Sequence, residues 1–207
     1  MSLKQKYKEI LRIPINKKNR KLLRNNNITI LSSNCTGGVL SHDLGLQFLS
    51  PTINMYICPN DFIKFMMDIE NYIAYDLQED TNNNEEYPVA ILKDIKLHGL
   101  HYSNYQIMKE KWDERKKRIN WDNIYVMMFE RDGCTYEDIK KFDKLPYKNK
   151  VVFVHKDMPE IRSAVYIQNS ELLGDPMQKI KILTKYKNWF TGKRLIDAFD
   201  YVSFFNQ

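Results

Sequence analysis

The stretch from residue 28 to residue 38 constrains the fold of this chain most strongly. It reads Ile-Thr-Ile-Leu-Ser-Ser-Asn-Cys-Thr-Gly-Gly. An apolar, β-branched run that stops at small polar residues and two glycines predicts a buried strand, a tight loop and a helix beginning near Val39. Such a unit brings backbone N–H groups to a positive helix end, so Asn34, Gly37 and Gly38 are predicted to bind a phosphate or carboxylate.

The two glycines also have a purely structural interpretation. The stretch lacks the lysine and spacing of a P-loop, and it lacks the third glycine of a dinucleotide-binding fingerprint. Gly37 and Gly38 can serve only to let a strand turn into a helix. Both interpretations stay open from the residues alone.

The later part of the chain repeats the pattern of strand, polar loop and helix. Residues 123–129 and 150–155 are predicted strands, residues 88–98 a hairpin that turns at Lys93 and Asp94, and residues 52–58 a further strand. Residues 176–207 are expected to be mostly helical, with Trp189, Phe190 and the aromatic residues from Phe199 through Phe205 covering the sheet. The predicted fold is therefore three-layer α/β, with a mostly parallel central sheet, helices on both faces and a β-hairpin insertion.

Positive charge is concentrated at the N-terminus. Residues 1–26 contain nine lysines and arginines against Glu9 alone, so the net charge of +6 leaves residues 27–207 slightly negative. We therefore divide the chain into a basic helical arm, 1–26, and a single α/β domain, 27–207. Leu3, Tyr7 and Ile10 recur at helical spacing, and Pro14 is expected to end that helix. The arm either packs on the domain or a partner, or contacts an anionic membrane.

Composition also limits location and cofactors. The sequence contains no apolar run long enough to span a bilayer and no signal-peptide core, which indicates a cytoplasmic protein, with peripheral attachment to the inner membrane face as an alternative. Three widely spaced cysteines predict no disulfide framework or zinc cluster. No cofactor and no metal are expected. Nucleic acid is not expected as a partner, because the body lacks basic excess and recognition motifs.

Three side chains are candidates for catalysis. His101 follows the predicted hairpin and suits a general base, and Asp132 lies in the loop after a strand. Cys35 is a candidate nucleophile with His101 or His42 as its base, although an isolated cysteine is more often a small buried hydrophobe.

A second group of residues is predicted to bind substrate. Arg115 and Arg118 lie at helical spacing and could hold a common anion, and Trp121 could stack on a sugar. Tyr102, Asn120 and Arg131 complete the set. We expect the segments around positions 34, 101, 118 and 132 to meet in one cationic hollow at an edge of the sheet.

Several short motifs together resemble a known family. They are Asn34-Cys35-Thr36-Gly37-Gly38, Ser50-Pro51-Thr52, Asp61-Phe62-Ile63-Lys64-Phe65, His101-Tyr102, Lys111-Trp112 with Arg115 and Arg118, Ile119-Asn120-Trp121-Asp122-Asn123, Arg131-Asp132-Gly133-Cys134-Thr135, Phe142-Asp143-Lys144-Leu145-Pro146 and Phe199-Asp200-Tyr201-Val202. Over roughly residues 25–206 the chain resembles the bacterial domain of unknown function nineteen-nineteen. Members are often labelled exopolysaccharide or capsule biosynthesis proteins, which implies an association with sugar-polymer synthesis and an α/β fold, but no particular reaction.

Two functions follow as expectations. The first is a transferase of exopolysaccharide or capsule biosynthesis that acts on a carbohydrate with an anionic donor, held by arginines and the glycine loop, while His101 or Asp132 handles the proton. The second is a non-catalytic module that binds a glycan or a partner of the polysaccharide machinery.

Overall fold

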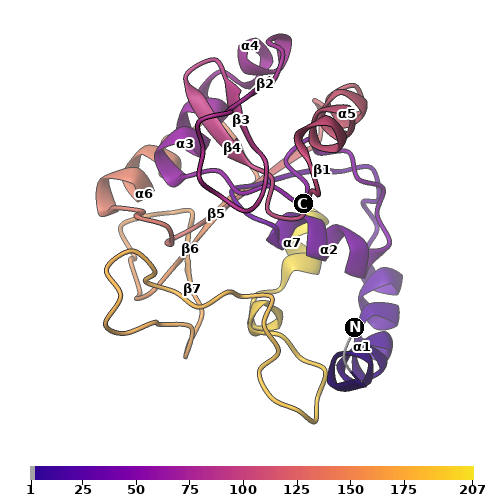
Figure 1. Cartoon of the computed structure of the whole chain (residues 1–207). Helices are drawn as coiled ribbons and strands as arrows, with labels where there is room; N and C mark the ends of the chain where they lie inside the picture. The colour runs from indigo at the N-terminus through magenta and orange to yellow at the C-terminus, as the bar shows by residue number, and fades with distance from the viewer. Residues whose placement is uncertain (1–2) are drawn as a thin grey trace.

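Four parallel strands form the centre of the structure, which is a computed structural model that describes residues 3–207. The strands are β1 (Thr29–Ser32), β5 (Ile124–Phe129), β6 (Lys150–Val154) and β7 (Ala164–Tyr166), and they lie in that order across the sheet. Figure 1 shows the four strands side by side. In the register of this sheet, Thr29 lies beside Ile124, and Val126 lies beside Lys150. The predicted strands at 123–129 and 150–155 are confirmed.

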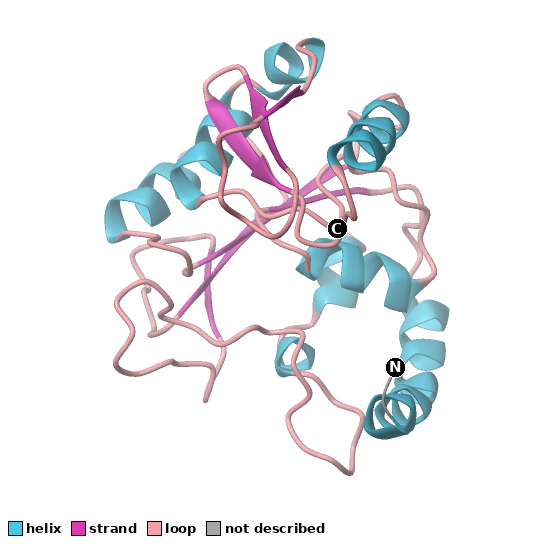
Figure 2. Ribbon diagram, viewed as in Figure 1, coloured by secondary structure: helices cyan, strands magenta, loops and turns pink. Residues whose placement is uncertain are grey.

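Helices cover both faces of this sheet, as Figure 2 shows. They are α1 (Leu3–Leu22), α2 (Thr36–Leu44), α3 (Pro59–Met67), α4 (Ile69–Ala74), α5 (Tyr105–Lys116), α6 (Tyr136–Asp143), the 3-10 helix η1 (Leu195–Ala198) and α7 (Tyr201–Phe205). Because side chains alternate along a strand, Val126 and Met128 of β5 face the core that contains α3, α5 and α6. Tyr125 and Met127 face α2 and α7. The predicted three-layer α/β fold is confirmed.

A separate antiparallel sheet is inserted between β1 and β5 in the sequence. It consists of β2 (Gln78–Glu79), β3 (Val89–Leu92) and β4 (Ile95–His98). The hairpin turns at Lys93 and Asp94 as predicted, and Lys93 takes a left-handed φ of 59°. Apolar residues of β3 and β4 enter the same core as α3 and α5, so the insertion is packed onto the domain.

The secondary-structure predictions for residues 52–58 and for the C-terminal region are wrong. Residues 51–54 form a turn, and within residues 52–58 Tyr56 makes a single bridge to His98. Asn54 has a left-handed φ of 65°, which interrupts an extended backbone. Residues 176–194 form turns and isolated bridges rather than helix, so helix in the C-terminal region is limited to η1 and α7.

The prediction that C-terminal aromatic residues cover the sheet is confirmed for the last helix and wrong for the loop before it. Trp189 and Phe190 are 44% and 82% exposed, whereas Phe204 and Phe205 cover the sheet. Gly192 takes a φ of 62° and lies so close to α1 that a Cβ there would come within 2.5 Å of the Leu11 carbonyl. This close approach favours an irregular loop over a helix, because only glycine fits both the space and the backbone angle.

The N-terminal helix continues through Pro14, so the prediction that Pro14 ends it is wrong. A proline in a helix costs about 3 kcal/mol because it removes one hydrogen bond and crowds the preceding turn. Contacts with α2 hold both halves of α1: Arg12 and Asn16 bind the Asp43 carboxylate, and Arg20 donates to the backbone oxygens of His42 and Asp43. Tertiary anchoring on either side of Pro14 compensates for the local cost.

Arg12 forms the most deeply buried of these contacts and is only 2% exposed. Its guanidinium lies 3.0 Å from Asp43 Oδ2 and 2.9 Å from Asp197 Oδ1, and it donates to Tyr201 Oη at 3.1 Å. Arg194 joins the network with Nη1 2.7 Å from Asp43 Oδ2. Burial by itself would lower the pKa of Arg12, but the hydrogen bond and charge of Asp197, with the charge of Asp43, raise that pKa above its ordinary value.

We expect the substitution Arg12→Ala to lower the free energy of unfolding by about 3–5 kcal/mol, because it leaves two carboxylates short of a buried partner. Urea denaturation measures the loss. Arg118→Ala is the matched control: Arg118 pairs with Glu114 on a partly exposed helix face, and its loss should cost at most about 1 kcal/mol. Equal losses for the two variants would contradict a structural role for the buried network.

Candidate functional site

The loops that follow β1 and β5 meet at the carboxyl edge of the parallel sheet, because the two strands are neighbours and run in the same direction. The chain then leaves β1 for α2 on one face and β5 for α6 on the other. Loops that diverge to opposite faces are typical of ligand-binding crevices in α/β sheets. The structure therefore brings Asn34 and Cys35 to the same edge as Arg131 and Asp132.

In the first loop, the polar and small residues have structural contacts. Asn34 Oδ1 accepts a hydrogen bond from the backbone N–H of Thr36 at 2.9 Å. Gly37 and Gly38 lie in the first turns of α2 and are buried, not in an open loop. A Cβ on Gly37 would come within 2.7 Å of the Ser32 Cβ. The structure thus gives Gly37 a packing role, which is the alternative left open from the sequence.

In the second loop, the side chains bind a C-terminal segment that crosses the edge. Asp132 Oδ1 accepts a hydrogen bond from Gln178 Nε2 at 2.7 Å, and the Arg131 guanidinium donates to the backbone oxygen of Ile180. Asp132 and Gly133 both take left-handed backbone angles, which form the tight turn. Their polar groups are therefore engaged by residues 178–180.

Tyr102 and Arg115 are buried together beneath the surface. Arg115 Nη1 donates to Tyr102 Oη at 2.7 Å, and the Tyr102 hydroxyl donates to the backbone oxygen of Ile53 at 2.8 Å. His101, their neighbour in the sequence, is exposed. Arg115 therefore cannot form an anion clamp with Arg118, which lies on the outer side and pairs with Glu114.

Arg118, Asn120 and Trp121 lie at the opposite edge of the sheet from Asn34. Asn120 donates its backbone N–H to Thr29 Oγ1 at 2.9 Å and its side-chain amide to the Asn27 oxygen at 2.7 Å, both near the start of β1. Trp121 is 43% exposed there. The expectation that positions 34, 101, 118 and 132 share one cationic hollow is wrong, because the first and third lie at opposite ends of parallel strands.

Burial controls the chemistry of Cys35. Burial raises the pKa of its thiol to about 11, so at neutral pH only about one molecule in ten thousand carries the nucleophilic thiolate. His42 follows Cys35 by seven positions, which corresponds to about 10 Å along a helix axis. These observations argue against Cys35 as a nucleophile activated by His42.

The sequence analysis missed a carboxylate–imidazole pair at the carboxyl edge. Glu130, directly after β5, is buried and lies 2.6 Å from His155 Nδ1, directly after β6, and it accepts the His155 backbone N–H at 2.8 Å. This arrangement holds Nδ1 and leaves Nε2 for proton transfer. The signal in the sequence was a polar residue directly after the predicted strand 123–129 and another at the end of the predicted strand 150–155.

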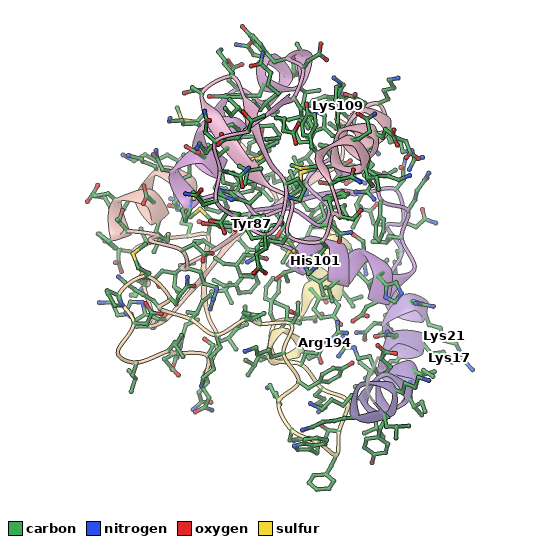
Figure 3. The ribbon with its side chains drawn as sticks, viewed as in Figure 1. Lys17, Lys21, Tyr87, His101, Lys109 and Arg194 are labelled. Atoms are coloured by element: carbon green, nitrogen blue, oxygen red, sulfur yellow. The ribbon has the colours of Figure 1, made fainter. Side chains whose placement is uncertain are left out.

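A cleft of about 1150 Å³ lies between α1 and α2, away from most of the residues predicted to form the site. Its walls are the side of α1 from Lys6 to Lys21, the exposed side of α2 at Val39 and His42, and Arg194 from the C-terminal segment. In Figure 3, Lys17 and Lys21 lie to the right of α1 and Arg194 lies to the left of this helix. Gly38 is the one predicted binding residue that lines this cleft.

The cleft carries uncompensated positive charge. Arg12 and Arg194 are neutralised by Asp43 and Asp197. The other charged side chains that line the cleft are four cations and one acid, an excess of three positive charges: Lys6, Lys17, Arg20, Lys21 and Glu9. Arg20 donates to two backbone oxygens at the end of α2, which are neutral acceptors and leave its charge available. Such a hollow favours an anionic ligand.

Apolar and aromatic side chains lie among these cations. Ile10, Ile13, Val39 and Phe48 line the cleft, and the Tyr186 ring lies 5.0 Å from Lys8 Nζ and 5.2 Å from the Arg194 guanidinium carbon. The cleft can therefore hold a ligand with a charged part and an apolar or planar part. The sequence signal was the helical recurrence of positions 6, 10, 13, 17 and 20.

Two negative findings concern the described part of the chain. Within residues 3–207, no group of three or more histidine, cysteine or acidic side chains is arranged to hold a metal ion. Over the same residues, no helix combines the length and apolar character needed to cross a bilayer.

Comparison with known proteins gives two matches. A family model described as a domain of unknown function, DUF1919, matches residues 6–206. An uncharacterized protein of Haemophilus influenzae is 38% identical over 192 residues, which cover 93% of this chain and 90% of that protein. The family match begins earlier than the resemblance seen in the sequence, and it includes most of α1 and hence both walls of the cleft.

We expect alkylation of Cys35 by iodoacetamide to accelerate with pH up to about 11, because the raised pKa keeps the thiol neutral at lower pH. Mass spectrometry of a Cys58→Ser, Cys134→Ser variant, in which Cys35 is the remaining thiol, measures the rate. A half-maximal rate near pH 7 would instead show an activated nucleophile and restore Cys35 as a catalytic candidate.

Proposed function

The chain belongs to the DUF1919 family, and on that premise we propose that it binds an anionic, sugar-linked ligand of surface-polysaccharide synthesis in the cleft between α1 and α2. The observation that carries the proposal is the excess of three positive charges in that cleft. The resemblance to proteins labelled exopolysaccharide or capsule biosynthesis proteins supports the sugar-linked part. This proposal corresponds to a binding module, and it replaces the anion clamp of Arg115 and Arg118.

A nucleotide-sugar or a related sugar phosphate has the chemistry that the cleft suits. Its phosphates would face Lys17, Arg20 and Lys21, which line the cleft and form no ion pair with the acids of the described residues. Its planar or apolar part would lie against Phe48 and Tyr186. Electrostatic attraction then supplies selectivity for phosphorylated over neutral sugars.

The test compares a nucleotide-sugar, inorganic pyrophosphate and the free sugar by thermal shift and calorimetry. We expect the nucleotide-sugar to stabilise the protein by about 2.7 kcal/mol at one hundred times its dissociation constant, and the free sugar to have little effect. The double variant Lys17→Glu, Lys21→Glu should bind at least about tenfold more weakly, because it reverses the charge of one cleft wall.

The control variant is Lys117→Glu, which changes an exposed lysine that does not line the cleft. It should retain wild-type affinity. Equal binding of sugar and nucleotide-sugar, or equal affinity of the cleft and control variants, would contradict the proposed site.

A transferase is the second candidate, favoured by an imidazole inside the cationic cleft. His42 lines the cleft with an exposed imidazole, which could exchange a proton with an acceptor hydroxyl beside a bound donor. The Glu130–His155 pair is an alternative base, although neither residue lines the cleft. Transfer of a sugar, acyl or phosphoryl-linked group would then follow donor binding.

Two variants separate this candidate from simple binding. If the protein is a transferase, then His42→Gln or His155→Gln should lower donor turnover by about two orders of magnitude, the usual contribution of a general base, with donor affinity unchanged. Chromatographic detection of released nucleotide measures turnover. Absence of turnover in the wild type with every tight-binding donor would exclude the transferase and leave the binding module.

A further inference from the structure

Large apolar side chains are exposed along the outer side of α1. Leu3 is 87% exposed and Ile10 62% exposed, and Tyr7 and Ile13 are also on the surface. A soluble monomer rarely exposes such side chains together unless they contact another molecule. These residues recur at helical spacing and therefore form one stripe.

The loop of residues 186–194 extends this stripe. Tyr186 and Arg194 form an antiparallel backbone bridge at its base, and the backbone N–H of Lys187 donates to the Lys193 oxygen at 2.8 Å. These contacts close a short loop that contains Trp189 and Phe190. The loop lies beside the N-terminal half of α1 in Figure 1. Lys4 Nζ lies 3.5 Å from the Trp189 ring centroid, which joins the two elements into one surface.

This surface, made of the α1 stripe and the loop 186–194, is strongly basic. Along α1, residues 3–22 contain Glu9 as the single acidic residue, and residues 181–196 contain none. Lysines flank the exposed aromatic residues of the loop: Lys187 and Lys193 lie within it, and Lys185 directly precedes it. Exposed aromatic and aliphatic side chains surrounded by lysines are typical of proteins that lie on a membrane interface.

We propose that the α1 stripe and the loop 186–194 dock on the surface of an anionic lipid bilayer. The apolar side chains, among them Leu3 and Phe190, would enter the interface while the lysines contact lipid phosphates. Charge identifies the occupant: a second copy of the same lysine-rich surface would be repelled, and a nucleic acid offers no hydrocarbon layer to Leu3 and Ile10. This inference does not depend on the proposed ligand of the cleft.

Membrane docking would place the cleft at the lipid surface, because Ile10 and Ile13 belong both to the α1 stripe and to the cleft wall. Lys6 and Tyr186 also line the cleft next to this surface. An anionic ligand could then enter from the headgroup layer without crossing the solvent.

The experiment is sedimentation of the full chain with vesicles of phosphatidylcholine, with and without phosphatidylglycerol. Binding is expected with phosphatidylglycerol only, and it should weaken as salt is raised. Phe190→Ser should weaken binding about tenfold, since it removes one aromatic side chain from the interface. Lys187→Glu, Lys193→Glu should weaken it by at least as much.

Two controls make the result specific. Leu173→Ser changes a 93% exposed apolar residue in a different loop and should bind like the wild type, as should Lys117→Glu. In a Trp121→Phe background, a blue shift of the fluorescence on vesicle binding reports Trp189, because Trp112 is fully buried.

Four outcomes would overturn the proposal. They are no sedimentation with phosphatidylglycerol, unchanged binding of Phe190→Ser and the lysine variants, equal losses for Leu173→Ser and Phe190→Ser, and preferential binding to duplex DNA in competition with the vesicles. The last outcome would identify the surface as a nucleic-acid interface instead. Loss of vesicle binding by Phe190→Ser with intact nucleotide-sugar binding would separate this surface from the cleft.

Discussion

The buried ion pairs of Arg12 connect the two ends of the chain. Arg12 lies 31 positions from Asp43 and 185 positions from Asp197 in the sequence, yet its guanidinium binds both carboxylates. Burying one such charge without partners costs several kcal/mol, so the arrangement is stable only with two arginines matched to two aspartates. The position of α1 on the domain depends on this balance.

The cleft is a consequence of that anchoring. Arg12 and Arg20 hold α1 against α2, and as a result Lys6, Lys17 and Lys21 line a cleft between the two helices. At the carboxyl edge of the sheet, Arg131 and Asp132 bind the segment around Gln178 and Ile180. These two charged side chains therefore stabilise the fold and are not available to a ligand. The charged groups that can bind a ligand are therefore those that line the cleft.

Local patterns in the sequence predict much of the architecture. The strand at 28–32, the strands β5 and β6 and the hairpin turning at Lys93 follow from short-range alternation and turn residues, and each is confirmed. The errors have long-range causes. Pro14 stays within a helix because α2 holds both of its sides, and residues 176–194 stay irregular because Gly192 packs on the backbone of α1.

The sequence by itself determined that this chain forms a layered α/β domain with a basic N-terminal helix, because hydrophobic periodicity and charge are properties of neighbouring residues. Only the tertiary structure decided which charges remain available. Arg115 and Asp132, which look like binding residues, are engaged by buried or crossing segments, while Lys17 and Lys21 face the cleft. Neutralisation of a charge depends on its partners in space, and those partners lie far away in the sequence.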